Sequence, residues 1–72
     1  MRRAILEALR LKYEAEIAEA DATANIYLEN SVGIGEHPQH IEEVNKQIEK
    51  IANAKEKLQV LDEFGSAIVF KP

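Results

Sequence analysis

The chain has 72 residues, a formal net charge of −4 and no cysteine. This length allows at most one domain, and the absence of cysteine excludes a disulfide framework and a thiolate metal site. Asp and Glu outnumber Lys and Arg by 13 to 9, which disfavours nucleic acid as the principal partner. The basic residues available for such a role are Arg2, Arg3, Arg10 and Lys12.

Apolar residues recur every three or four positions from the start of the chain, which predicts a helix over residues 3–31. One apolar face contains Leu6, Leu9, Tyr13, Ile17, Ala20, Ala24, Leu28 and Ser31. A second stripe, almost opposite, consists of Ala4, Ala8, Leu11, Ala15, Ala18, Ala22 and Ile26. Small side chains let helices approach closely, so we interpret this alanine stripe as an oligomer interface. The alternative is that Ala occurs there only because it is the best helix former.

A turn is predicted over residues 32–37, because two glycines and a proline lie close together there. Gly33 suits the left-handed position after a helix, and Pro38 suits the first turn of the next one. The second helix is expected over residues 38–64, followed by a tail over 65–72. Its apolar seam contains Ile41, Val44, Ile48, Ile51, Lys55, Leu58 and Leu61, with Ala54 nearby.

These elements predict an all-α fold: an antiparallel two-helix hairpin that self-associates as a four-helix bundle, with a dimer as the simplest symmetric form. If the chain folds back at the glycines, two residues face each other when their numbers add to about 69. Leu28 should then face Ile41 and Val44. Lys55 lies on the seam, where it either fixes the register or lays its aliphatic stem on the core with its ammonium in water. The second interpretation is favoured.

The tail after Gly65 differs in character from the helices, with the apolar run Ala67, Ile68, Val69 and Phe70 before Pro72. We expect it to pack on this protein or its own oligomer. It could instead bind another protein as an added strand, or be a cloning remnant, because residues 63–66 read like a cloning junction.

The only candidate metal ligands are His37, His40 and Glu43, with Glu36 nearby. Imidazole and carboxylate groups bind divalent metals, but the spacing matches no recognised metal motif. We therefore interpret these residues as polar residues of the turn. We expect no cofactor and no catalysis. A small-ligand-binding or metal-binding bundle that uses His37, His40 and the nearby carboxylates is the alternative function.

No apolar run approaches the roughly 20 residues that span a membrane. Charged residues interrupt the short apolar run near the N-terminus, so we expect a cytoplasmic protein without an export signal.

The stretch Tyr27–Pro38, and above all Gly33-Ile34-Gly35-Glu36-His37-Pro38, resembles the turn of small uncharacterised helical-hairpin proteins of marine tailed phages. The resemblance implies a hairpin fold, a location in the host cytoplasm and an accessory role. It implies no specific activity or site. The function expected from the sequence is that of a structural or protein-interaction module.

Overall fold

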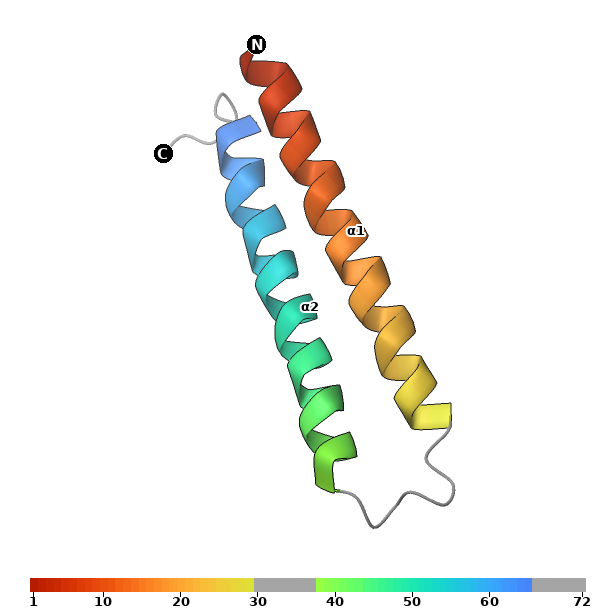
Figure 1. Cartoon of the computed structure of the whole chain (residues 1–72). Helices are drawn as coiled ribbons and strands as arrows, with labels where there is room; N and C mark the ends of the chain where they lie inside the picture. Colours follow the sequence, from red (N-terminus) through yellow and green to blue (C-terminus); the bar gives the residue numbers. More distant parts are fainter. Residues whose placement is uncertain (30–37, 66–72) are drawn as a thin grey trace.

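The computed structural model describes residues 1–29 and 38–65, which form two antiparallel α-helices packed side by side (Figure 1). Helix α1 covers Arg2–Glu29 and helix α2 covers Pro38–Gly65. The predicted all-α hairpin is therefore confirmed. Residues 30–37 and 66–72, including Ser31, the predicted turn and most of the predicted tail, lie outside the described residues.

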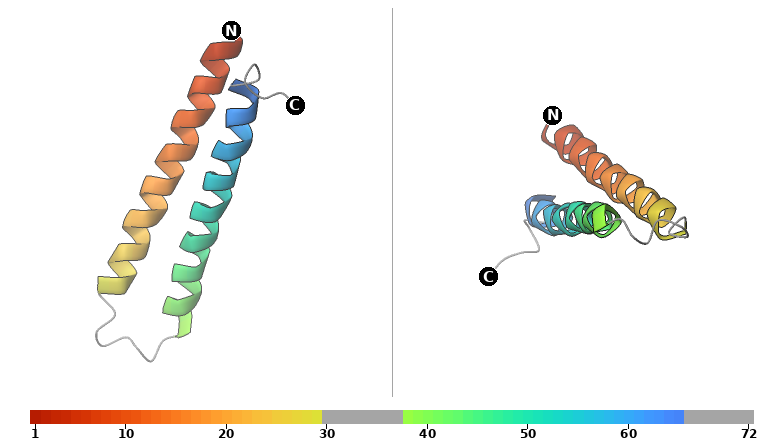
Figure 2. Two further views of the ribbon diagram at one scale, coloured as in Figure 1. Left: turned by 180° about the vertical axis from the view of Figure 1, so that it is seen from behind. Right: turned by 60° about the horizontal axis from the view of Figure 1, so that its bottom comes forward.

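The hairpin is a thin rod, 53 × 24 × 14 Å, only one helix thick in its shortest direction (Figure 2). Its radius of gyration is 16.5 Å, whereas a compact chain of this length would have about 11 Å. Each 28-residue helix is about 42 Å long, so the two helices can lie against each other over nearly their whole length. The shape leaves both broad faces of the pair open.

The most deeply buried residues between the helices are alanines. Ala20, Ala24 and Ala54 are 2%, 8% and 1% exposed, and Gln47 is the fourth buried residue of the described part. Among the described residues, no large side chain is fully buried. Ala20 and Ala24 belong to the face of α1 predicted to meet α2, so that face is assigned correctly along most of its length. Leu28, predicted to belong to it, is 59% exposed.

The seam of α2 differs from the predicted one. Apart from Glu43, the buried and half-buried positions follow alternating steps of four and three: His40, Val44, Gln47, Ile51, Ala54, Leu58 and Leu61. The predicted seam members Ile41 and Ile48 are 74% and 56% exposed, and Lys55 is exposed. Each lies one residue beyond a true seam position, about 100° further around the helix. Lys55 is therefore not a seam residue, and Gln47 is the polar residue at the centre of the contact.

Contacts at the two ends of the hairpin fix the register of the helices. The Tyr27 and His40 rings pack edge to face, with centroids 5.1 Å apart. At the opposite end Arg2 donates a hydrogen bond to the carbonyl oxygen of Phe64. The residue numbers of these pairs add to 67 and 66, slightly below the predicted 69. Leu28 and Ile41 do not face each other, because Ile41 lies about 100° around α2 from the seam residue His40.

The Arg2–Phe64 contact has a simple electrostatic reason. Carbonyl groups in the last turn of a helix have no partner within the helix, and that end carries partial negative charge. Arg2 lies at the start of α1, where a cation is unfavourable, but the antiparallel arrangement places it beside the C-terminal end of α2. The antiparallel fold therefore gives the basic start of α1 a partner at the end of α2.

Candidate functional site

The alanine stripe predicted to be an interface lies on the edge of α1 that points away from α2. All seven of its residues are exposed: Ala4, Ala8, Leu11, Ala15, Ala18, Ala22 and Ile26. The two largest, Leu11 and Ile26, are 52% and 59% exposed. The hairpin therefore leaves this stripe accessible, and its use as an interface stays a prediction.

Large apolar side chains also remain uncovered elsewhere on the described residues. Those about half exposed or more, besides Leu11 and Ile26, are Met1, Ile5, Leu28, Ile41, Ile48, Val60 and Phe64. Scattered apolar residues are normal on protein surfaces, but here they outnumber the buried ones. The candidate functional feature of this chain is consequently its uncovered apolar surface.

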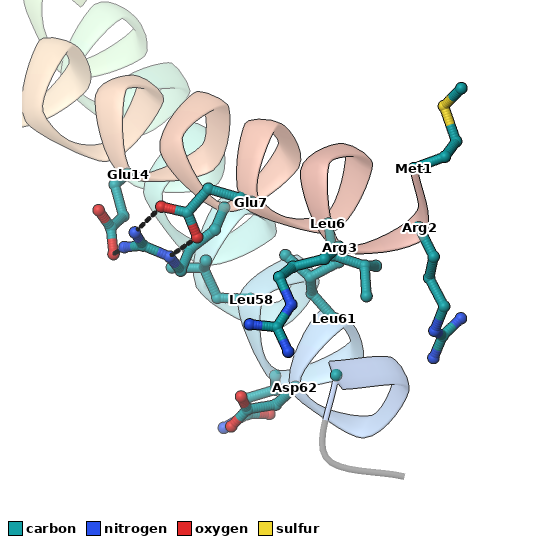
Figure 3. A pocket seen from close by; sticks show the side chains of 12 residues that line it. Met1, Arg2, Arg3, Leu6, Glu7, Glu14, Leu58, Leu61 and Asp62 are labelled. Atoms are coloured by element: carbon teal, nitrogen blue, oxygen red, sulfur yellow. Dashed lines mark hydrogen bonds and ion pairs between the residues drawn. The ribbon is translucent and has the colours of Figure 1, made fainter.

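One groove of the described residues, with a volume of about 870 Å³, lies on one broad face beside the start of α1 and the end of α2. Figure 3 shows Arg3, Glu7 and Glu14 of α1 on the same side of the hairpin as Leu58 and Asp62 of α2. We call this side of the hairpin the A face. Its groove is lined by charged side chains around a leucine floor, with polar and apolar surface in about equal parts, so it is an open mixed surface rather than an enclosed pocket.

Arg10 organises the charges of this groove. Its guanidinium donates hydrogen bonds to both carboxylate oxygens of Glu7, with Nε 3.2 Å from Oε1, and its Nη1 lies 2.9 Å from Glu14 Oε2. These hydrogen bonds are the main reason that the pKa of Glu7 lies below its ordinary 4.5; partial dehydration opposes them, and Coulomb attraction to Arg10 adds to them. The same two carboxylates raise the pKa of Arg10.

Substituting Arg10 by Gln is expected to raise the pKa of Glu7 back to about its ordinary 4.5, because the hydrogen bonds and the attraction disappear together. A carboxyl whose pKa is lowered by folding stabilises the fold above its unfolded pKa and loses this contribution as the pH falls through its folded pKa. Stability should therefore decrease below about pH 5 less steeply in the variant. NMR titration of the Glu7 side chain measures the pKa.

The matched control is Lys12→Gln, which removes a cation that pairs with Glu16 instead, 3.1 Å away on the same helix. The Glu7 titration should be unchanged in this variant. An unchanged Glu7 pKa in Arg10→Gln would contradict the assignment of Arg10 as the cause.

The opposite broad face, the B face, carries two smaller grooves. One, of about 500 Å³, is mainly apolar and is lined by Leu6, Leu9, Tyr13, Asn53, Glu56, Lys57, Val60, Leu61 and Phe64. Lys57 reaches from α2 across to α1, where its Nζ lies 5.4 Å from the centre of the Tyr13 ring, a cation–π distance. The other, about 330 Å³, is polar and lies beside Gln47, Thr23 and Lys50. Because lysines and glutamates line this groove, the middle of the B face is a hydrated surface.

The candidate metal ligands do not converge within the described part of the chain. The ring of His40 packs against Tyr27, and Glu43 pairs with Lys46 at 3.5 Å. No group of three or more His, Asp or Glu side chains in residues 1–29 and 38–65 is arranged to hold a metal ion. His37 and Glu36 lie outside the described residues.

Comparison of the chain with protein-family models, with curated proteins and with solved structures gives no match. Neither α1 nor α2, in the portion that the structure describes, is long and apolar enough to cross a membrane.

Proposed function

We propose that this chain is a non-catalytic structural or protein-interaction module that acts as a homodimeric helical bundle. The observation that carries the proposal is the lack of an interior: among the described residues only three alanines and Gln47 are buried. Each fully buried Leu or Ile stabilises a fold by roughly 1.5–3 kcal/mol, and none of the described ones is fully buried here. Small folds of this kind gain the missing stability from disulfides, metals or association.

Association is the remaining route for this composition. The chain has no cysteine, and the described residues contain no metal-binding cluster. A second copy is the simplest partner, because a two-fold dimer covers the same apolar surface on both chains at once. The cytoplasm, that of the host cell if the chain is phage-encoded, is the proposed location, supported by the absence of cysteine. The resemblance to phage hairpins, most of whose distinctive residues lie outside the described part, stays a prediction.

The proposal predicts a mass of about twice the 8.1 kDa of the chain and a melting temperature that rises with protein concentration. Dimerisation stabilises the folded state by mass action, so dilution must weaken it. Sedimentation equilibrium and thermal melts followed by circular dichroism, over a hundredfold range of concentration, measure both quantities. A cooperative monomer of 8.1 kDa whose melting temperature does not depend on concentration would contradict the proposal.

A further inference from the structure

The mainly apolar groove of the B face lies beside the end of α2. Val60 and Phe64, which line it from α2 near that end, are 46% and 55% exposed. Leu6 and Leu9 line it from α1 and are half-buried. The groove is therefore an apolar hollow, open to water, that begins one residue before Gly65, the last residue of α2.

The segment that follows, residues 66–72, has a composition that suits this groove. It contains four consecutive apolar residues, Ala67, Ile68, Val69 and Phe70, and removing such side chains from water favours packing. In an extended chain, successive side chains alternate between two sides. Ile68 and Phe70 can therefore enter a groove together, while Val69 faces away from it.

The segment also has a suitable length. The groove follows α2 from Phe64 back to Asn53, eleven residue steps and so about 17 Å of helix. An extended chain advances about 3.3 Å per residue, so residues 67–71 cover this distance once residues 65 and 66 have reversed the chain direction. The reversal is unobstructed at Gly65, where an added Cβ would have no neighbour within 4 Å among the described residues.

We propose that residues 67–71 pack into the B-face groove of their own chain and run antiparallel to α2. The order of polarity matches in this direction. The groove is apolar beside Phe64, and its far end is lined by the polar residues Asn53, Glu56 and Lys57. The segment is likewise apolar as far as Phe70 and then polar at Lys71.

The same direction brings two rings together at the far end of the groove. Phe70 reaches the level of Tyr13, whose ring already lies 5.4 Å from the Lys57 ammonium. A second ring beside this cation adds an aromatic contact and keeps the ammonium near a π face. Phe70 therefore ends the apolar run at a contact that the described helices have already formed.

The groove of the A face begins equally close to the segment but is less suitable. Gly65 itself lines it, but so do Arg10, Glu7 and further charged side chains along its whole length. An apolar segment laid over them would dehydrate these charges without replacing their contacts with water. The B-face groove has no charged residue in its half beside Phe64, so the segment can cover it without this cost.

This inference goes beyond the proposed self-association and does not depend on it, because the groove and the segment belong to one chain. A segment joined directly to the edge of a groove binds it at a high effective concentration, whereas a second copy must compete from solution. The end of the B face is then covered within each chain.

NMR spectroscopy of the full chain tests the contact directly. We expect nuclear Overhauser effects between the Phe70 ring and the methyl groups of Val60, which lines the B-face groove and not the A-face groove. In an equal mixture of isotope-labelled and unlabelled chains, these effects should occur within one chain. Effects to Leu58, which lines only the A-face groove of the two, effects between chains, or no effects would each overturn the proposal.

Two neighbouring substitutions in the segment test its orientation. Ile68→Ser and Val69→Ser each remove a β-branched apolar side chain, but only Ile68 faces the groove. At one protein concentration, Ile68→Ser should lower the melting temperature by about 4–8 °C and Val69→Ser by less than about 2 °C. A shift in Ile68→Ser no larger than that in Val69→Ser would contradict the packing of this segment in the groove.

A substitution in the groove tests the other side of the contact. Val60→Lys places a cation in the apolar half, so the Overhauser effects between the Phe70 and Tyr13 rings should disappear. Ile48→Lys is the matched control, because Ile48 is exposed on the same helix (56%) and lines neither groove. Both variants should keep their helical circular dichroism. Ring contacts that persist in Val60→Lys, or disappear equally in Ile48→Lys, would overturn the proposal.

The outcomes separate this inference from the proposed function. A monomer that shows the Phe70 contacts within its own chain contradicts self-association and supports the groove. A dimer without these contacts leaves self-association intact and overturns the groove.

Discussion

Substituting Ala54 by Asp is expected to abolish the hairpin. Ala54 is 1% exposed and lies, by the register of the helices, at about the level of Tyr13. A carboxylate at this position would be dehydrated without room for a partner, and burying an unpaired charge is among the few changes that cost about 4 kcal/mol or more. A core of this size supplies no more than about 3–5 kcal/mol. The helical signal at 222 nm should therefore disappear at 25 °C.

The control for this prediction is Ala52→Asp, two residues earlier on α2 and exposed. It introduces the same side chain into the same helix, and its cost should be limited to the lower helix propensity of Asp, at most about 0.7 kcal/mol. Equal loss of helix in the two variants would show that Ala54 is not at the closest contact of the helices. Urea unfolding at one protein concentration gives both free energies.

Substituting Gln47 by Leu is expected to raise the free energy of unfolding by about 1–2 kcal/mol. Gln47 is 7% exposed and lies beside Ala20 and Thr23 at the polar groove of the B face. Leu has a similar volume, and its burial adds hydrophobic stabilisation without the cost of dehydrating an amide. A higher urea midpoint with an unchanged slope would show this gain.

The gain should be accompanied by a less specific register. A single polar residue at a seam position disfavours alternative alignments of two helices at a cost in stability. We expect exchange broadening of the Tyr27 and His40 ring resonances in Gln47→Leu, because their contact depends on the register. Gln59→Leu, at an exposed position of the same helix, is the matched control and should change neither stability nor line widths. Sharp ring resonances in Gln47→Leu would show that Gln47 does not specify the register of the helices.

The candidate surface could be predicted only in part. The apolar character of Ile41 and Ile48 is evident in the sequence, and so is the pairing of Arg10 with Glu14 one turn away. Their roles were assigned differently because either 41, 44, 48, 51 or 40, 44, 47, 51 gives steps of three and four. Hydrophobic periodicity selects the two isoleucines, and only the packed helices show that His40 and Gln47 occupy the seam.

The sequence by itself determined the hairpin: helical periodicity in both segments, breakers between them, and the face of α1 that meets α2 at Ala20 and Ala24. These are local properties, because they depend on residues within one or two turns of each other. The tertiary structure decided which arc of α2 is covered. Two helices can contact along only one narrow strip, and α2 carries apolar residues over a wider arc than this strip. The strip that is covered contains Ala54, at 1% exposure, and leaves Ile41 and Ile48 uncovered.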